Sequence, residues 1–311
     1  MLTANLPDAG LTGDGLSGGA WTMWIHSEEE LLLPHGLYDE DGVCHRAAVL
    51  RSLTGNQEAL LGGARRVELS ALLEACLSRI GGYEQPSRAH VEALTRGDRD
   101  FLALRLRRSL FGDRLSLVVT CVNPACSARA DLDLEIDALA PEREEPSPEY
   151  LDVPTPGGLA RVREPTGADD RALSRIGGSR NERAAELWSR LLIDLDGRGP
   201  LSARGWLELA APVRHSIALG LSEGSAAPDL GVATACPSCG ASMQLTLDPL
   251  ALLVRELRQG SERLIAEVHC LSWAYGWSEA DILALPRPRR WRYLELVRRQ
   301  MEGRPLVDGW S

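Results

Sequence analysis

The chain has 311 residues, a formal net charge of −10 and a pI of about 5.2. This length allows two ordinary domains that each bury a core, so a metal is not expected to be the only source of stability. The acidic balance disfavours binding to nucleic acid or to an anionic membrane unless basic residues are segregated. All 34 basic residues are arginine, which we interpret as a genomic composition bias and not as a set of phosphate contacts. The apolar runs are too short for a membrane helix and no signal-peptide pattern is found, so we expect a cytoplasmic protein.

The first part of the chain predicts an N-terminal arm followed by a first repeat unit. Residues 1–30 are rich in Gly, Asp and Ser and predict a flexible N-terminal arm. Residues 31–139 predict a first repeat unit, in which an extended segment containing arginine leads into a Thr-Gly turn at Thr54. Two amphipathic helices follow, and a strand, a pair of cysteines and a second strand close the unit.

A second unit follows a Pro- and Glu-rich segment, residues 140–158, which predicts a linker. Residues 159–252 repeat the landmarks of the first unit, with Thr166 over Thr54 and Asp170 over Glu58. The stretch beginning at Arg214 likewise matches the one beginning at Arg99. Four landmarks in the same order predict one supersecondary pattern used twice.

The remainder of the chain, residues 253–311, has a different pattern and predicts a C-terminal helical interaction element. The whole sequence therefore predicts an α+β fold with two pseudo-symmetric, internally repeated units. Each unit contributes helices and a cysteine-bearing, zinc-ribbon-like β-hairpin. Residues 46–139 are expected to superpose on residues 159–252.

Four of the seven cysteines fall in two close pairs, Cys121 with Cys126 and Cys236 with Cys239. In each pair the first cysteine ends an apolar strand and the second precedes another strand, which is the outline of a zinc knuckle. The repeat predicts that the two hairpin tips meet. Four thiolates complete a tetrahedral shell and leave no position for a substrate, so we expect one structural Zn²⁺.

Other interpretations of the cysteines remain open. The pairs could be unliganded, could form disulfides, or could belong to a thioredoxin-like redox site, although that motif opens a helix rather than a strand. The three single cysteines, Cys44, Cys76 and Cys270, fit small buried side chains.

Sequence signals for catalysis are weak. Gly15–Gly19 and Gly220–Gly224 match GxSxG, but neither has the strand-turn-helix context of a nucleophile elbow. No metalloprotease, phosphate-loop or dinucleotide motif is found. We therefore predict that the chain is not an enzyme.

Two stretches carry a family resemblance. "VPTPGGLARVREPTGADDRAL", residues 153–173, resembles the opening of the baseplate hub assembly chaperones of T-even-type phages, a family also found beside contractile injection system genes. The tail "LSWAYGWSEADILALPRPRRWRYLEL", residues 271–296, resembles a helical element of phage-tail and injection-system accessory proteins. Members among phages are usually smaller and have a single unit, and paired cysteines are not their hallmark. The zinc prediction therefore rests on the cysteine spacing alone.

The resemblance implies a binding role, as an accessory or assembly factor whose partners are baseplate hub or spike proteins, and it brings no catalytic residues. Aromatic and arginine side chains anchor interfaces, so the tail is the expected partner-binding surface. The residues singled out are Trp273, Trp277, Trp291, Arg287, Arg289, Arg290 and Arg292. Packing of the aromatics within the tail is the alternative to an exposed patch. The alternative function is a zinc-ribbon nucleic-acid-binding protein that uses the arginine-rich C-terminal helix.

Overall fold

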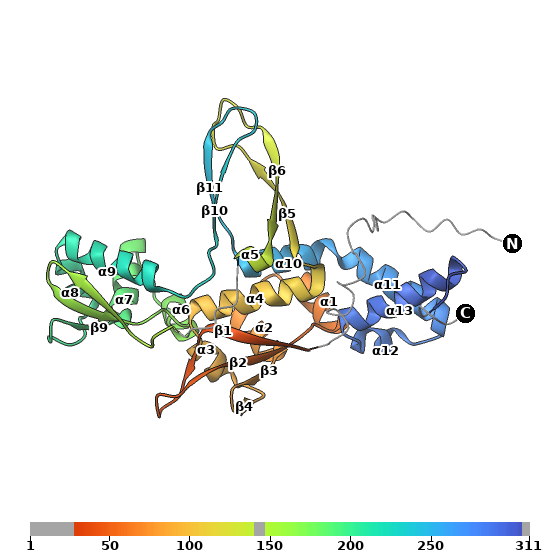
Figure 1. Ribbon diagram of the computed structural model, residues 1–311, viewed down its shortest axis with the longest axis horizontal. Coiled ribbons are helices and arrows are strands. Elements are labelled where there is room, and N and C mark those ends of the chain that lie inside the picture. Colours follow the sequence, from red (N-terminus) through yellow and green to blue (C-terminus); the bar gives the residue numbers. More distant parts are fainter. Residues whose placement is uncertain (1–27, 140–146, 307–311) are drawn as a thin grey trace.

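The computed structural model describes residues 28–139 and 147–306, and it has an α+β fold with small antiparallel sheets (Figure 1). Most of the predicted N-terminal arm lies outside the described residues. Residues 28–30 already belong to the first strand. No helix in the described ranges is both long and apolar enough to cross a bilayer.

A four-stranded sheet and the long helix that covers it form the centre of the molecule. The strands, in sheet order, are β1 (Glu28–Tyr38), β2 (Cys44–Arg51), β3 (Leu77–Ile80) and β4 (Tyr83–Glu84). The helices are α1 (Gly55–Gly63), α2 (Leu69–Cys76), α3 (Arg88–Ala93) and α4 (Arg96–Phe111). Thr95 caps α4 by accepting from the N–H of Asp98, and Gly112, at φ 89°, ends it. Phe101 and Leu102 of α4 are fully buried in the largest core.

A second layer of sheet and helices follows in a similar order of elements, without a counterpart of β4. Its strands are β7 (Leu151–Thr155), β8 (Gly158–Val162) and β9 (Leu192–Leu195), and its helices are α6 (Gly167–Ser174), α7 (Arg180–Leu191), α8 (Ala203–Glu208) and α9 (Ala211–Gly224). In the first sheet β2 pairs with β1 and β3, and in the second β8 pairs with β7 and β9. The register shifts between Val49 and Leu50 in β2 and between Arg161 and Val162 in β8. This layer has a separate core that includes Trp206 and Ile217.

The predicted linker needs a correction, because part of residues 140–158 is regular structure. Strand β7 pairs with β8 throughout its length, with Pro154 opposite Leu159. Proline has no N–H to donate, but β7 is an edge strand of its sheet, where a missing donor is tolerated. The proline and charge content that predicted a linker is therefore compatible with an edge strand.

Two hairpins rise together from the body as a finger (Figure 1). They are β5 (Arg114–Thr120) with β6 (Arg129–Glu135), which leads into α5 (Ile136–Leu139), and β10 (Gly231–Ala235) with β11 (Ser242–Thr246). Each hairpin follows the last helix of its layer, α4 or α9, and the two hairpins share a small core.

The described part of the chain ends with four helices: α10 (Pro249–Gln259), α11 (Ser261–Tyr275), α12 (Glu279–Ala284) and α13 (Arg287–Met301). The predicted boundary at residue 252 falls inside α10. This helix packs on α1 and α4, and its Leu253 and Leu257 are buried in the core of the first layer. The last three helices extend that layer to one end of the elongated molecule (Figure 1).

Candidate metal centre

The four paired cysteines lie in the two turns at the tip of the finger. In the first turn the N–H of Cys121 donates to Ala128 O (2.8 Å), and in the second the N–H of Cys236 donates to Ala241 O (2.9 Å). Left-handed backbone conformations at Ser127 (φ 49°) and Gly240 (φ 70°) close the turns. Each turn therefore projects two sulfur atoms beyond its last strand pair.

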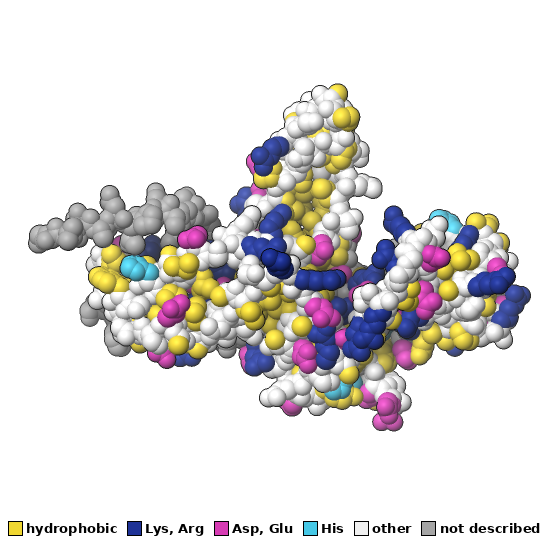
Figure 2. All heavy atoms as spheres, turned by 180° about the vertical axis from the view of Figure 1, so that it is seen from behind, with side chains coloured by type: hydrophobic (Ala, Val, Ile, Leu, Met, Phe, Trp, Pro, Cys, Tyr) yellow, Lys and Arg dark blue, Asp and Glu magenta, His cyan; other side chains and the backbone are white. Residues whose placement is uncertain are grey.

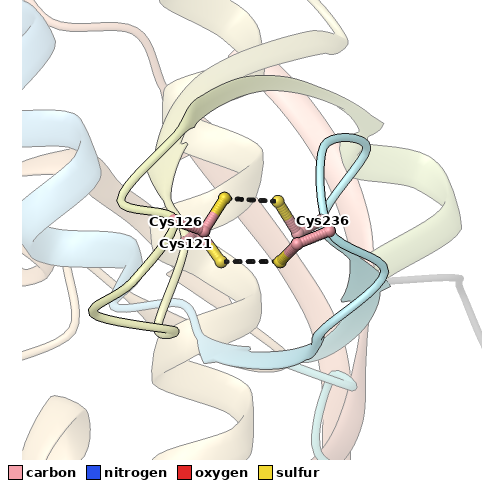
Figure 3. Close-up of side chains that lie close together, drawn as sticks. Cys121, Cys126 and Cys236 are labelled. Atoms are coloured by element: carbon pink, nitrogen blue, oxygen red, sulfur yellow. Dashed lines mark hydrogen bonds between the residues drawn. The ribbon is translucent and has the colours of Figure 1, made fainter.

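The four sulfur atoms come together from opposite sides, all within 4.8 Å of one another (Figure 3). The distance between sulfurs is 3.6 Å from Cys121 to Cys239 and 3.9 Å from Cys126 to Cys236. A tetrahedron with Zn–S bonds of about 2.3 Å has edges of about 3.8 Å, whereas a disulfide needs about 2.05 Å. The cysteines are free thiols at the spacing of metal ligands, and the structure brings together all four residues that the spacing predicted.

Backbone donors favour a thiolate at one of the four positions. The N–H groups of Ser238 and Cys239 point at Cys236 and lower its pKa to about 7. The N–H of Asn123 acts in the same direction on Cys121, but burial and the neighbouring thiols outweigh it and raise the pKa of Cys121 to about 12. Four facing thiols cannot all ionise without a compensating charge, and a divalent cation supplies one.

The finger has little apolar surface of its own with which to hold its hairpins together. Leu115 and Leu117, at the base of β5, belong to the core of the body. Nearer the tip, Val119 and Met243 are the buried apolar side chains besides Cys121 and Cys236. A pair of two-stranded hairpins is marginally stable without further support. A cross-link at the tip would supply that support.

A metal ion bound by all four cysteines would have a closed shell, as in a structural centre. Four protein ligands leave no open coordination position for water or substrate. The pair Cys236 and Cys239 lies in a hairpin turn and not at a helix N-terminus, unlike a thioredoxin-type pair. Cys76 is buried apart from the cluster, and burial raises its pKa to about 12, so it is an inert core thiol.

The predicted partner-binding tryptophans differ in exposure. Trp273 is 73% exposed and Trp291 is 37% exposed. The half-buried Trp277 stacks on Tyr275 at 4.8 Å and meets Tyr293 edge-on at 4.8 Å. Both interpretations of the tail therefore apply, because some aromatics pack within it and Trp273 is open to solvent.

The arginines predicted to join that exposed patch need a correction. Arg290 is fully buried and Arg287 is 4% exposed, so neither can contact a partner in this fold. Arg290 binds Glu267 (2.9 Å) and Glu58 (2.7 Å), which are equally hidden. Arg289 and Arg292 are exposed. The acidic partners lie far away in the sequence, so the local pattern could not reveal this burial.

Sequence reasoning missed the contacts by which the α3–α4 and α12–α13 junctions bind other parts of the chain, although a shared sequence motif marks these junctions. The six-residue stretches Leu94–Arg99, Leu209–Arg214 and Leu285–Arg290 share the spacing L-x-x-[G/P]-x-R.

Of the two GxSxG matches, Gly220–Gly224 forms the last turn of α9 and Gly15–Gly19 lies outside the described residues. The match at Gly220–Gly224 therefore has no nucleophile-elbow geometry.

Comparison with protein-family models, curated proteins and solved structures finds no match to this chain. The functional assignment therefore depends on the geometry above and on the resemblance of the two sequence stretches.

Proposed function

We propose that the chain is a non-enzymatic accessory or assembly factor, chaperone-like, for the baseplate hub of a contractile phage-tail-like injection system. In this proposal a structural Zn²⁺ staples its two hairpins, and its partners are hub or spike proteins. One observation carries the binding role: the tail that resembles injection-system accessory proteins also presents an exposed tryptophan beside an apolar groove.

The groove lies between α1, α11 and α12 and has a volume of about 630 Å³. Its lining includes Leu264, Ile265, Trp273 and Leu283. Ile265 is 63% exposed, and Trp273 is 73% exposed. Large apolar side chains left in water beside a concave surface are typical of sites that bind another protein.

Zinc is the metal that best fits the donor set, because four soft thiolates in a tetrahedral arrangement suit a structural zinc. The two hairpins come from opposite halves of the chain. A bound ion would therefore fix the first layer to the second and would leave the rest of the surface free for partners.

We further propose that the two layers are copies of one unit. Apart from β4, which has no counterpart, the common order of strands and helices supports this, as do the two sheets with a register shift at matching positions. The capping Thr residues at the start of α1 and α6 lie at matching positions as well.

The nucleic-acid alternative has less support. Of the tail arginines, Arg287 and Arg290 are buried, and Arg298 and Arg299 pair with Glu295. Arg289 and Arg292 are too few for the phosphate contacts of a typical nucleic-acid surface, and the net charge is −10.

The test is co-expression of the tagged chain with the hub and spike genes of its own cluster, followed by affinity capture. We expect a hub or spike component to co-purify with the wild-type chain and to be lost with Trp273→Ala. Arg298→Ala, a change on the exposed face of α13, is the control. Capture that is equal for wild type and Trp273→Ala would contradict the proposed surface, and salt-sensitive retention of DNA or RNA would favour the alternative.

A further inference from the structure

Two helix pairs in this chain each receive a Thr-Gly turn from another part of the chain. At the first joint, the turn that begins α1 lies against the junction of α12 and α13. The N–H of Gly55 donates to Leu285 O (3.2 Å), and the N–H of Arg287 donates to Leu53 O (3.2 Å). These two bonds form a short antiparallel bridge between Thr54 and Pro286.

At the second joint, the turn that begins α6 lies against the junction of α3 and α4 in the same way. The N–H of Gly167 donates to Leu94 O (3.2 Å), and the N–H of Arg96 donates to Pro165 O (2.7 Å). The bridge here joins Thr95 and Thr166. This joint attaches the second layer to the first.

A buried arginine accompanies each bridge and binds a carboxylate four residues after the capping threonine. Arg290 binds Glu58 at 2.7 Å, and Arg99 binds Asp170 at 2.8 Å. The arginines are 0% and 5% exposed, respectively. Glu58 is also buried (6%), whereas the side chain of Asp170 is 36% exposed. Hydrogen-bonded pairs of arginine and carboxylate give directional recognition as well as attraction.

The glycine of each turn is needed for close approach. A Cβ atom at Gly55 would lie 3.0 Å from the Cα of Leu283, and one at Gly167 would lie 3.0 Å from the Cα of Glu92. Leu283 and Glu92 each stand seven residues before the arginine of their joint. The two joints thus recognise the same feature, a Thr-Gly turn followed by an acidic residue.

The junction of α8 and α9 has the form of a third joint, but none of the described residues docks on it. Leu209 and Arg214 occupy the positions of Leu94 and Arg99. Within residues 28–139 and 147–306, Leu209 O and the Ala211 N–H make no inter-element backbone bond, and Arg214 has no ion pair. In the two occupied joints a second arginine also contacts the carboxylate, Arg287 on Glu58 (3.4 Å) and Arg96 on Asp170. Ala211 stands at that position in the third junction.

The surface around this third junction is open and apolar. Leu207, seven residues before Arg214, is 47% exposed. A groove of about 480 Å³ runs beside it, lined by Trp188, Trp206 and Arg214 among others. The two indole rings stack at 4.8 Å. The junction lies at the end of the molecule opposite α11 to α13 (Figure 1), in the lobe at the right of Figure 2.

We propose that the α8–α9 junction is a docking joint for a partner protein that presents a strand-to-helix turn of the form Thr/Ser-Gly-x-x-Asp/Glu. The glycine would allow the approach to Leu207, the backbone would bridge to Leu209 and Ala211, and the carboxylate would pair with Arg214. Both docked turns of this chain are already used within it, so the occupant is another protein. The joint depends neither on the metal nor on the baseplate assignment.

The test uses full-length protein with ¹⁵N-labelled tryptophan and a synthetic peptide of residues 159–176, which carries the Thr-Gly turn of α6. Because the free peptide is flexible, binding is followed by NMR up to millimolar peptide. We expect the indole signals of Trp188 and Trp206 to shift in a saturable manner, and Arg214→Glu to weaken binding about tenfold or more. Arg204→Glu, an exposed change on α8 away from the groove, should have no effect.

Two further peptides sharpen the result. A peptide with Gly167→Val should bind the wild-type protein much more weakly than the unchanged peptide does. A peptide with Asp170→Arg should bind the Arg214→Glu protein more tightly than it binds the wild-type protein. Absence of any shift at Trp188 and Trp206, or equal binding to Arg214→Glu protein, would overturn the proposal. Self-association of the wild type that Arg214→Glu abolishes would also overturn it, because the occupant would then be a second copy of the chain.

Discussion

The finger and the helical body of this protein are held together by different means. The body buries complete leucine and phenylalanine side chains, such as Phe101 and Leu102 of α4, between helix and sheet. Beyond its base, where Leu115 and Leu117 join the core of the body, the finger buries Val119 and Met243 together with two of its four thiols. Apolar area is sufficient for the body, whereas we expect the tip of the finger to depend on the metal that its four thiols can hold. Loss of the cross-link should therefore damage one region and spare the other.

The largest expected effect is removal of the metal. Structural zinc sites contribute apparent binding free energies of about 10 kcal/mol or more, and in the finger that energy is folding free energy. Cys236→Ser, or a strong chelator, should raise amide hydrogen exchange across residues 114–135 and 231–246 by orders of magnitude. Exchange in α4 should change little. Cys270→Ser is the control, and equal loss of protection in finger and body would break the comparison.

A smaller but still large effect is expected at the buried arginine of the first joint. Arg290→Ala removes the nearest cation of both Glu58 and Glu267 and leaves only the longer contacts with Arg287 (3.4 Å) and Arg263 (3.7 Å). This should cost about 3–5 kcal/mol of unfolding free energy. The exposed neighbour Arg289 is the matched control, and Arg289→Ala should stay within about 0.5 kcal/mol. Urea unfolding monitored by circular dichroism measures both. Equal midpoints for the two variants would contradict the burial of Arg290.

Next comes the close approach at the second joint. Gly167→Ala places a Cβ atom 3.0 Å from the Cα of Glu92 and should destabilise by about 1–3 kcal/mol. Gly177→Ala, whose Cβ would meet nothing within 4 Å, is the control. Thermal unfolding of the two variants separates them, and a Gly167→Ala variant as stable as Gly177→Ala would show that the layers are not docked through this turn.

The smallest effect on stability belongs to the exposed tail. Trp273→Ala removes a side chain that is 73% exposed, so its melting temperature should match that of the wild type while partner capture is lost. Trp206→Ala, in contrast, empties part of a core and should cost several kcal/mol. A large fall in stability for Trp273→Ala would place that side chain in the fold and not at an interface.

The local patterns predicted much of this architecture. The cysteine spacing and the matched landmarks Thr54 and Thr166 predicted that the two cysteine-bearing turns meet. This was possible because a hairpin and a helix cap are formed by residues near one another in the chain. Residues 151–155 were predicted as part of a linker because of their proline and charged residues, but the same composition also suits an edge strand such as β7. Local sequence does not distinguish the two.

The burial of Arg290 was out of reach for a different reason. Its partner Glu58 is 232 residues away, and only the docking of α1 on α12 brings them together. An arginine on a helix is expected to be exposed unless the carboxylate that pairs with it is known. The open joint at Arg214 became visible only after the two occupied joints had been compared in three dimensions.

X-ray absorption at the zinc edge, on protein purified without chelator, tests the central claim most directly. We predict about one zinc per chain and a first shell of four sulfur atoms at about 2.3 Å, contributed by Cys121, Cys126, Cys236 and Cys239. A shell that contains nitrogen or oxygen ligands, or a protein that folds its finger with no bound metal, would contradict the account.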